Sequence, residues 1–532
     1  MVGLRTLLPA TLGTPLLNLA AYTNLTLSVP ARAPAGASAV QGNFLGISIE
    51  LNIVNTLIGE SPESIPKPVI NLLSALSSRT AQPLRLRIGG NSVDAGSKYD
   101  PNAKKMINFN LNSTFKAVPN LPVTYGPQLL TTLKKLGDVV NGSTNVLGLS
   151  LSTPKNVADI IKFVYDSQQV LGDSLLSLQL GNEPDSFPSH GYRPENYTRQ
   201  QYYDDFRTVT SQFQSSSFGD LVSKPILGAP SFCCSWNLDE LVREGFIAQN
   251  GGVLNYVLYQ HYPKSSCVPN TWDFSYFLEH TNVVQFAQIQ APGIALARAA
   301  GKPVILSEFN SVSCGGKRGQ SDTASFGVAM WTIDFVLSLA INNVTAAYIH
   351  TREVGISYNL INPPNPRNPA WSVGPQYYSM LFLAEALKGV PGDPSGSVIV
   401  ADLNLPTSTT ASLAGYAIYD QKGEILQRIV LINYGDIRTT DCSARPAFTF
   451  TVPPSILPAS NNRTLSTKYF TGGCVTETNA SVLTWGGQAV GGDGMLSLGL
   501  PAPNESVIAC SQGCEVSVPS PSVVLINLDG SY

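Results

Sequence analysis

SLQLGNEPDSF, residues Ser177 to Phe187, is the stretch that decides the fold. A short run of β-forming, mostly apolar residues passes directly into Gly-Asn-Glu-Pro-Asp. An apolar run that is closed by a glycine and a proline predicts a buried strand that ends in a turn. A barrel strand that points a catalytic acid into a cleft has this pattern, and so has an ordinary strand with a polar turn. The rest of the chain decides between these two interpretations.

Short apolar segments alternate with longer helical patterns from about residue 44 to residue 390. The predicted strands are 44–51, 83–91, 146–152, 177–185, 225–231, 257–263, 303–310 and 346–352. The predicted helices include 69–78, 127–140, 156–167, 324–341 and 377–389, in which apolar residues recur at spacings of three and four. Strands that are each followed by a helix predict an α/β fold, a (β/α)8 TIM barrel.

The pattern changes after about residue 390, where helical periodicity ends and short alternating strands lie between Gly, Pro, Asn and Ser clusters. This predicts a C-terminal antiparallel β-sandwich domain, and the segment LTLSVP (25–30) predicts one more strand of it. A chain of 532 residues also exceeds what one core supports. We therefore expect a catalytic barrel over residues 41–389 and a sandwich built from residues 23–40 and 390–532.

Composition points to a secreted glycoprotein. Charged residues make up only 13%, and 33 basic against 36 acidic residues give a net charge of −3 without a long basic run, which argues against nucleic acid or a membrane as partner. Asn-x-Ser/Thr triplets occur at Asn24, Asn112, Asn141, Asn196, Asn343, Asn462, Asn479 and Asn504. Residues 1–22 resemble a weak signal peptide, and an ordinary N-terminus is the alternative.

Eight cysteines, an even number, favour an oxidising compartment. They form a middle group and a late group, within which we expect disulfides to form: Cys233, Cys234, Cys267 and Cys314, then Cys442, Cys474, Cys510 and Cys514. A zinc site is a poor alternative, since the late group has one Cys-x₃-Cys and no histidine near it. With only four histidines in the chain, we expect no catalytic metal and no cofactor.

The active sites of (β/α)8 barrels lie at the C-terminal ends of the strands, so the residues at those positions are the candidates. Polar residues at or beyond the predicted strand ends are Glu50, Asn91, Ser92, Asn182, Glu183, His261, Tyr262, Glu308, His350, Arg352 and Tyr358. Each has a structural alternative: Glu50 as an ion-pair partner of Arg85 or Arg87, Asn91 and Ser92 as shapers of the Gly-Gly turn, and Tyr358 as loop packing. We interpret His261 as a structural histidine and Cys314 as a disulfide cysteine.

Glu183 and Glu308 stand out because each follows a buried strand on opposite sides of the predicted barrel mouth. Retaining glycosidases need two carboxyl groups about 5–5.5 Å apart, one as acid and base and one as nucleophile. We predict Glu183 as the acid/base, with its pKa raised largely by the negative charge of Glu308. We predict Glu308 as the nucleophile, kept ionised by a hydrogen bond from Tyr262, and Asn182 as a ligand of a sugar hydroxyl.

Five motifs give the chain a family resemblance: SIEL near residue 50, LRIGGNSVD, LGNEPD, YQHYP and SEFNSVSCGG. With Asn-Glu-Pro after strand four and a second glutamate on strand seven, the chain resembles the retaining (β/α)8 glycoside hydrolases, and in these details glycoside hydrolase family 79. That family contains β-glucuronidases and heparanases, and the similarity is greatest to its secreted fungal β-glucuronidases.

The resemblance implies Glu183 as acid/base and Glu308 as nucleophile. It also implies that neutral donors grip the carboxylate of glucuronic acid, namely backbone N–H groups near Gly315 and the hydroxyls of Tyr262 and Tyr358. A Gly-Gly loop would let those N–H groups approach an anion closely. Arg352 is the alternative, because it would grip the carboxylate directly. Glu50, Asn91 and Ser92 would bind the ring hydroxyls.

We therefore expect a secreted, retaining exo-β-glucuronidase that removes terminal glucuronic acid or 4-O-methyl-glucuronic acid from glycans or glucuronides. The basic clusters by which heparanases bind sulfated polymers are absent from the sequence. Two alternatives stay open: an endo-acting or neutral-sugar glycosidase of the same clan, and a non-catalytic carbohydrate-binding protein.

Overall fold

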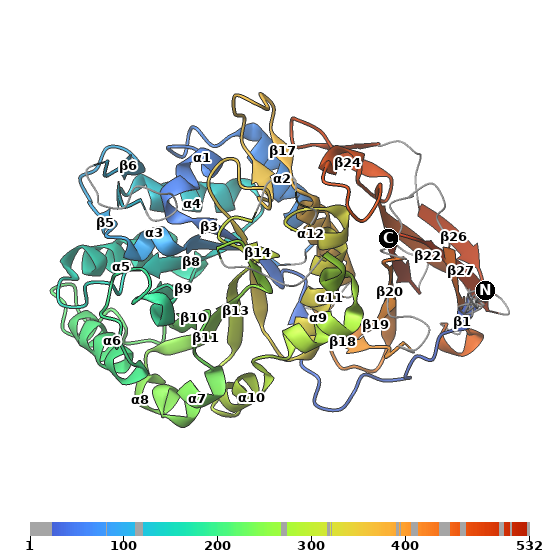
Figure 1. The fold of residues 1–532 in the computed structure, drawn as a ribbon, viewed down its shortest axis with the longest axis horizontal. Helices are drawn as coiled ribbons and strands as arrows, with labels where there is room; N and C mark the ends of the chain where they lie inside the picture. The colour runs from blue at the N-terminus through green and yellow to red at the C-terminus, as the bar shows by residue number, and fades with distance from the viewer. Residues whose placement is uncertain are drawn as a thin grey trace, which may run out of the picture.

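Eight parallel strands close into a barrel in a computed structural model of the chain, as Figure 1 shows. The structure describes residues 24–80, 82–111, 121–267, 274–316, 320, 322–389, 393, 395–405, 413–435, 447–457, 464–498, 505–510 and 513–528. The barrel strands are β3 (Leu45–Glu50), β4 (Leu84–Gly89), β8 (Ser143–Leu149), β9 (Leu175–Leu180), β10 (Leu227–Phe232), β11 (Leu254–His261), β13 (Val304–Phe309) and β15 (Ala346–Thr351). Each overlaps one of the eight predicted segments, so the predicted TIM barrel is confirmed.

The long helices cover the outside of the barrel. Five overlap predicted helices: α2 (Lys67–Ser77), α4 (Gln128–Val139), α5 (Ala158–Leu171), α11 (Phe326–Ile341) and α12 (Pro375–Ala386). The others are α1 (Val54–Ile58), α3 (Asn91–Asp94), α6 (Arg199–Gln214), α7 (Leu238–Arg243), α8 (Phe246–Asn250), α9 (His280–Ala287) and α10 (Ala291–Ala299). Helix α6 begins with a capping box, in which Thr198 and Gln201 satisfy each other's backbone N–H groups.

Three small sheets lie in the loops between the barrel elements. A three-stranded sheet of β5 (Lys98–Tyr99), β7 (Val123–Tyr125) and β6 (Ile107–Phe109) is inserted between α3 and α4. Two-stranded pairs join β12 (Lys264–Ser265) to β14 (Val312–Ser313) and β16 (Ile361–Asn362) to β17 (Ser372–Val373). The sequence did not predict these insertions. The strands of both two-stranded pairs follow the C-terminal ends of barrel strands.

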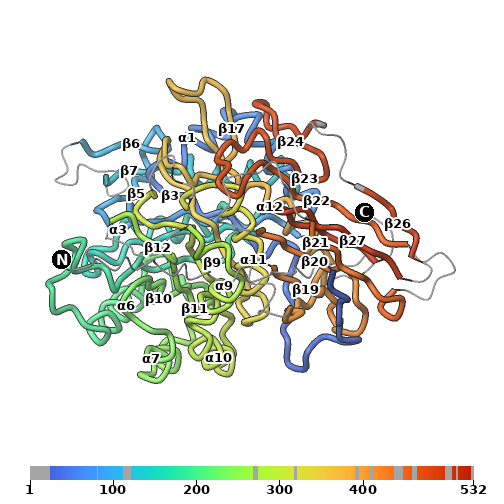
Figure 2. The backbone as a smooth tube through the Cα atoms, turned by 45° about the vertical axis from the view of Figure 1, so that its right-hand side comes forward, coloured from blue at the N-terminus to red at the C-terminus, as the bar shows by residue number. Residues whose placement is uncertain are grey.

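The C-terminal part is an antiparallel β domain with two sheets, as Figure 2 shows at the right. The larger sheet contains β2 (Val40–Gln41), β18 (Ser397–Asp402), β19 (Leu413–Asp420), β20 (Leu426–Asn433), β28 (Ser522–Asn527), β22 (Thr464–Thr471), β23 (Thr484–Trp485), β24 (Gln488–Val490) and β25 (Leu496–Leu498), with β26 (Glu505–Ala509) paired to β22. The smaller sheet contains β1 (Asn24–Thr26), β21 (Ala447–Val452) and β27 (Cys514–Pro519). Phe450 and Val516 of the smaller sheet pack with Ile429 of the larger one in a single core, as in a sandwich.

The N-terminal strand β1 pairs with β21 of the same domain, with Leu25 opposite Phe450. The sandwich that includes an N-terminal strand is thus as predicted, except that β1 runs parallel to β21. In Figure 1, helices α11 and α12 lie between the barrel strands and the β domain. The N–H of Phe326, the first residue of α11, donates to the carbonyl of Glu477 at 2.8 Å, so the junction is hydrogen-bonded as well as apolar.

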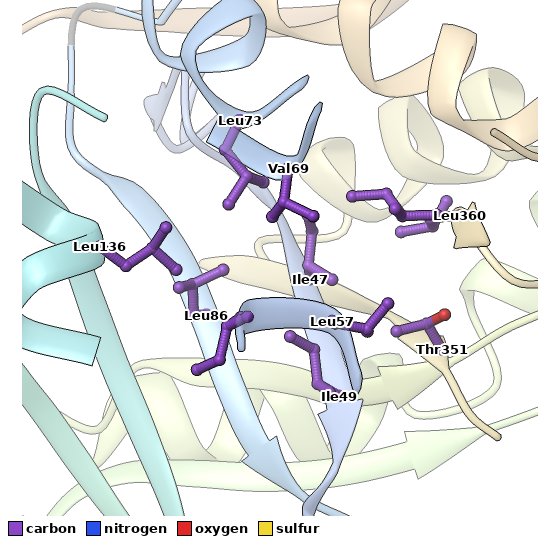
Figure 3. A pocket seen from close by; sticks show the side chains of 11 residues that line it. Ile47, Ile49, Leu57, Val69, Leu73, Leu86, Leu136, Thr351 and Leu360 are labelled. Atoms are coloured by element: carbon purple, nitrogen blue, oxygen red, sulfur yellow. The ribbon is translucent and has the colours of Figure 1, made fainter. Parts of the chain in front are cut away.

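An apolar cavity of about 20 Å³ lies outside the barrel wall, as Figure 3 shows. Ile47 and Ile49 of β3 and Leu73 of α2 line it. Side chains alternate between the two faces of a strand, and Ser48 of the same strand points inward to His350. The cavity is therefore a gap in the packing between strands and helices, on the far side of the wall from the polar residues of the barrel interior.

Two disulfides, Cys233–Cys234 and Cys267–Cys314, join the middle group of cysteines, and Cys510–Cys514 joins two of the late group. Cys442, in the late group, lies outside the described residues. Among the described glycosylation triplets, Asn24, Asn141, Asn196 and Asn479 are exposed. In the part of the chain that the structure describes, no helix is both long and apolar enough to cross a membrane.

Candidate active site

Glu183 lies in a turn beyond the end of β9. The predicted strand continued to residue 185, but β9 ends at Leu180, because Gly181 takes a left-handed backbone and Pro184 begins a 3₁₀ turn. Glu183 itself has φ 52°, which is uncommon for a residue with a side chain, and its N–H donates to Ser231 O at 3.0 Å. Backbone strain of this kind is held in place by the surrounding structure and is concentrated at functional sites.

Glu308 lies on β13 and is held by three partners. Tyr262 Oη donates to Oε1 at 2.7 Å, Arg87 Nη1 donates to Oε2 at 2.5 Å, and His350 Nε2 lies 3.7 Å from Oε1. Burial acts to raise the pKa of Glu308, but His350, Arg87 and Tyr262 outweigh it and lower the pKa below its usual value. The environment therefore favours the ionised carboxylate, and Tyr262 makes the predicted hydrogen bond.

Glu183 has the opposite electrostatic environment. Burial raises its pKa well above the usual value, and the negative charges of Glu308 and Asp185 add to this effect against the positive charge of Arg87. The sequence prediction gave Glu308 as the main cause. That order was wrong, because desolvation of the carboxyl group in the barrel mouth is the larger effect. Glu183 thus prefers the protonated form and Glu308 the ionised form, which is the difference that an acid and a nucleophile in one site require.

Arg87 on β4 connects the surroundings of both glutamates, and the sequence analysis did not place it in the site. Besides Glu308, its guanidinium donates to Ser48 Oγ at 2.8 Å, to Gln179 Oε1 at 3.1 Å and to Asn182 Oδ1 at 2.6 Å. The alternation of side chains along β4 could have placed Arg87 in the barrel interior. Leu86 packs in the core outside the barrel, so its neighbour Arg87 lies on the opposite, inner face of the strand. An arginine on the inner face of a barrel strand is a candidate ligand of carboxylates.

Asn182 is held from several sides. Its N–H donates to Asp94 Oδ2 at 2.7 Å, and its Nδ2 donates to Asn91 Oδ1 at 2.9 Å. Asp94, which sequence analysis also missed, accepts backbone N–H groups from Leu151 and Ser152 as well. It ties the ends of β8 and β9 together, and its position three residues after Asn91 in the NSVD motif was the available signal.

Glu50 and Ser92 contact each other directly. The N–H and the hydroxyl of Ser92 donate to Glu50 Oε1 at 2.8 and 2.6 Å, and His350 Nε2 lies 3.4 Å from Glu50 Oε2. The alternative of an ion pair from Glu50 to Arg85 or Arg87 is wrong, because Arg87 pairs with Glu308 and Arg85 donates to neutral amides. Ser92 is fully buried, and its hydroxyl donates to Glu50.

Gly315, Tyr358 and Arg352 meet on the other side of Glu308. Gly315 has φ 84°, and a Cβ at this position would lie 2.7 Å from Ile356 Cδ1 and 3.6 Å from Arg352 Nη1. Burial, the largest effect, raises the pKa of the Tyr358 hydroxyl, although the positive charge of Arg352 acts to lower it. The structure therefore adds the guanidinium of Arg352 to the two predicted residues, although Glu353 also pairs with it at 3.0 Å.

His261 and the disulfide loop have structural surroundings. The His261 ring stacks on Phe286 at 4.6 Å, in agreement with its interpretation as a structural histidine. Asp185, Cys233 and Cys234 form a cluster of possible metal ligands among the described residues. The two sulfurs are joined in a disulfide, and both carboxylate oxygens of Asp185 accept backbone N–H groups, so this cluster offers no thiolate.

Comparison with known proteins places this chain among glycoside hydrolases. Residues 415–525 match the glycosyl hydrolase family 79 C-terminal beta domain. A β-glucuronidase from Aspergillus niger is 26% identical over 465 residues, which are 81% of this chain and 80% of the Aspergillus protein. The chain therefore carries a C-terminal domain of the glycoside hydrolase family 79 type and is similar in sequence to a β-glucuronidase.

Solved structures share this fold at low sequence identity. A 4-O-α-L-rhamnosyl-β-D-glucuronidase from Fusarium oxysporum has a TM-score of 0.76 at 21% identity, covering 95% of this chain and 100% of that chain. A family 51 arabinofuranosidase from Xanthomonas axonopodis pv. citri has a TM-score of 0.59 at 15% identity, covering 95% and 99%. These two likenesses show the fold.

Proposed function

We propose that the chain is a retaining exo-β-glucuronidase of glycoside hydrolase family 79, in which Glu183 is the acid/base and Glu308 the nucleophile. The observation that supports this most directly is the difference between the two carboxyl environments. Glu308 is held by Arg87 and Tyr262, which favour its ionised form, whereas burial favours the protonated form of Glu183. A double displacement needs this pair of states before the substrate binds.

In the first step Glu308 Oε attacks the anomeric carbon while Glu183 transfers its proton to the leaving oxygen, and a covalent glycosyl-enzyme forms. In the second step ionised Glu183 takes a proton from water, the water oxygen attacks the anomeric carbon, and Glu308 leaves as a carboxylate. Asn182, fixed by Arg87 and Asp94, would hydrogen-bond a sugar hydroxyl beside the anomeric centre. Glu50 and Asn91 would bind ring hydroxyls, and Ser92 would hold Glu50 in place.

For the carboxylate of glucuronic acid we propose the position between Gly315, Tyr358 and Arg352. A glycine with a left-handed backbone exposes its N–H without a Cβ, and the tyrosine hydroxyl and the guanidinium add donors. Arg352→Met is expected to lower kcat/KM for the glucuronide by about tenfold or more, while kcat/KM for the matching glucoside changes little. An equal loss on both sugars would contradict this position.

Hydrolysis of 4-nitrophenyl β-D-glucuronide, beside the matching β-glucoside and β-xyloside, tests the proposal. We expect preference for the glucuronide, and proton NMR should show the β-anomer of glucuronic acid first. Glu183→Gln and Glu308→Gln should abolish turnover with folding intact. The α-anomer appearing first would overturn the retaining mechanism, and a preference for neutral sugars would overturn the substrate.

The 4-position of the sugar needs its own comparison, because the Fusarium oxysporum relative is described as a 4-O-α-L-rhamnosyl-β-D-glucuronidase. Unsubstituted, 4-O-methylated and 4-O-rhamnosylated glucuronides should be measured in parallel. Eight sequons, the disulfides and the absence of a long basic run support the proposal that the enzyme is secreted and acts on extracellular glycans or glucuronides. Detection of the mature chain in culture medium tests that location.

A further inference from the structure

Gln260, on strand β11, contacts Glu183 through its side-chain amide. It is fully buried, and one end of the amide lies 2.7 Å from Asn182 Oδ1 and 3.0 Å from Ser231 Oγ. The other end lies 2.9 Å from Glu183 Oε1. An amide has a donor end and an acceptor end, which are distinguished by their hydrogen-bond partners. Its orientation therefore decides whether Glu183 must accept or donate a proton at this contact.

Arg87 fixes the orientation from one side. A guanidinium only donates, so Asn182 Oδ1, at 2.6 Å from Arg87 Nη2, is an acceptor, and the opposite end of Asn182 donates to Asn91 Oδ1 at 2.9 Å. An oxygen of Gln260 placed 2.7 Å from Asn182 Oδ1 would set two acceptors against each other. Arg87 Nη2 also lies 3.3 Å from this end of Gln260, a contact that by itself would favour an oxygen there, but it is longer than the 2.7 Å contact to the acceptor Asn182 Oδ1. The nitrogen of Gln260 thus faces Asn182.

A chain of hydroxyl groups fixes the same orientation from the other side. Ser307 Oγ donates to the carbonyl of Tyr259 at 3.2 Å, and Ser231 Oγ lies 3.2 Å from Ser307 Oγ. Since each hydroxyl has one proton, Ser231 donates to Ser307 and has a lone pair left for a donor. Gln260 Nε2 is that donor at 3.0 Å. Both neighbours of Gln260 therefore leave its amide oxygen facing Glu183.

We propose that Gln260 is a positioning residue that keeps Glu183 protonated between turnovers, because its amide oxygen accepts the O–H of the Glu183 carboxyl group. An ionised Glu183 would set two acceptors 2.9 Å apart, so this contact favours the neutral acid. The inference rests on the proposed role of Glu183 as acid, and it adds the group that maintains the proton. After proton transfer, the repulsion between the two oxygens favours the step that returns a proton to Glu183.

Charged groups and two tyrosine hydroxyls also face Glu183, and Gln260 acts beside them. The charged groups are Glu308 on β13, Asp185 in the turn after Glu183, Arg87 on β4 and Glu50 on β3, with the hydroxyls of Tyr262 and Tyr192 also near. The carboxylates disfavour ionisation of Glu183 and Arg87 favours it. The amide of Gln260 is a neutral contact whose effect depends on its orientation alone, which makes it separable by substitution.

The pH dependence of kcat/KM in Gln260→Met tests the orientation by the direction of the shift. If the oxygen accepts from Glu183, its removal takes away support for the neutral acid, and the alkaline limb moves to lower pH by about one unit. If the nitrogen donated to Glu183, the alkaline limb would move to higher pH, which would overturn the proposal. No shift of the alkaline limb would overturn it as well.

Gln179→Met is the matched control. Gln179 is a buried glutamine on the neighbouring strand β9, and its hydrogen bonds reach Asn182, Gly181 and Arg87. The same substitution there disturbs the same network without removing the contact to Glu183. We expect the alkaline limb of Gln179→Met to stay within a few tenths of a pH unit of the wild-type value. An equal shift in both variants would show a general effect of the network and contradict a specific role of Gln260.

Two further measurements keep the test decisive. Ser231→Ala removes one of the two partners that orient the amide, so its alkaline limb should move in the same direction as that of Gln260→Met, by a smaller amount. The infrared band of the protonated Glu183 carboxyl, obtained as the difference between wild type and Glu183→Gln, can be titrated without any turnover. This titration should show the same downward shift in Gln260→Met even if no glucuronide is hydrolysed, which separates this inference from the proposed function.

Discussion

Arg87 and Glu308 form a buried ion pair across the barrel, with Nη1 2.5 Å from Oε2 and side chains 0% and 8% exposed. The same guanidinium donates to Asn182, the residue next to Glu183. One cation therefore holds the proposed nucleophile ionised and fixes the turn that carries the proposed acid. Removing one partner of a buried pair leaves an uncompensated charge, which costs more than the pair itself contributes.

Arg87→Lys should lower kcat/KM by about a hundredfold or more while the protein stays folded. Lysine keeps the charge, but it lacks the planar fork that reaches Glu308, Gln179 and Asn182 together. Arg87→Met should in addition lower the free energy of unfolding by about 3–5 kcal/mol. Steady-state kinetics and urea unfolding measure the two effects. Arg199→Lys, at a partly exposed ion pair with Glu240 and Glu244, is the control, and its free energy of unfolding should stay within about 1 kcal/mol of the wild-type value. A wild-type kcat/KM in Arg87→Lys would refute the role of Arg87.

A bell-shaped pH dependence of kcat/KM is expected for the wild-type enzyme. Protonation of Glu308, whose pKa is lowered, removes the nucleophile on the acid side. Ionisation of Glu183, whose pKa is raised, removes the proton donor on the alkaline side. The two limbs report apparent values of the interacting pair. With an aryl glucuronide whose leaving group needs no protonation, the alkaline limb should weaken for the first chemical step, and an unchanged limb would contradict the role of Glu183.

Tyr262→Phe should shift the acid limb of kcat/KM to higher pH. The hydroxyl donates to Glu308 Oε1 at 2.7 Å and stabilises the carboxylate, so its loss raises the pKa of Glu308. We expect kcat to fall by about tenfold to a hundredfold, because the transition state loses a positioned donor. Tyr259→Phe, at a buried tyrosine on strand β11, three residues before Tyr262, is the control. An acid limb that stays in place would mean that Tyr262 serves only packing.

The sequence predicted the presence and order of the barrel strands well, because apolar strands and the turns that follow them are local patterns, although β9 ends at Leu180 and not at residue 185. Glu183 and Glu308 came directly from the predicted strand ends, and so did Tyr262. Arg87 did not, because its role depends on contact with Glu308, 221 residues away. The order of causes for the pKa of Glu183 also needed the structure, since burial depends on every element around the barrel mouth.

The orientation of the Gln260 amide is a second feature that the sequence alone could not predict. The position of Gln260 on an inward face follows from alternation along β11, but the direction of its amide depends on Arg87, Asn182 and the serine pair together. Helix α6 was expected only from the rule of one helix after each strand and not from its own periodicity, because its surface is rich in polar side chains. The three-stranded insertion of β5, β6 and β7 was missed because strands of two and three residues carry no measurable periodicity.

The disulfide Cys233–Cys234 should matter for kcat more than for stability. Asp185, two residues after Glu183, accepts the N–H groups of Cys233 and Cys234 at 3.0 and 2.7 Å, so the disulfide loop and the acid turn support each other. Replacing both cysteines by serine should lower kcat by about threefold to tenfold, because the acid is then less well positioned. Its effect on the midpoint of thermal unfolding should be small, because very short disulfide loops constrain the unfolded chain least.

The matched control for that change is the double substitution of Cys510 and Cys514 by serine. This disulfide also closes a short loop, with a sequence separation of 4, but it lies in the β domain. We expect its removal to leave kcat at the wild-type value. A loss of kcat in both double variants, or in neither, would show that the position of Cys233–Cys234 beside the acid turn has no specific effect.

His280 should make the stability of the junction between barrel and β domain depend on pH. Its Nδ1 lies 2.9 Å from Asp334 Oδ1, and its Nε2 lies 3.2 Å from Asp402 Oδ2 on β18. Burial acts to lower the pKa of His280, but the two carboxylates outweigh it and raise the pKa from 6.5 to about 10. Tyr416 and Tyr434 donate to Asp334 as well, so the cluster joins α9, α11 and the larger sheet.

A raised pKa in the folded state means that folding binds a proton more tightly than the unfolded chain does. The contribution of His280 to stability is therefore fully present below about pH 6.5 and is lost as the pH rises towards about 10. The difference in the free energy of unfolding between wild type and His280→Gln, measured by urea unfolding, should shrink across that window. His190→Gln, at a histidine outside this cluster, should show no such decline. A difference that is constant from pH 6.5 to pH 10 would mean that the ion pairs of His280 do not stabilise the junction.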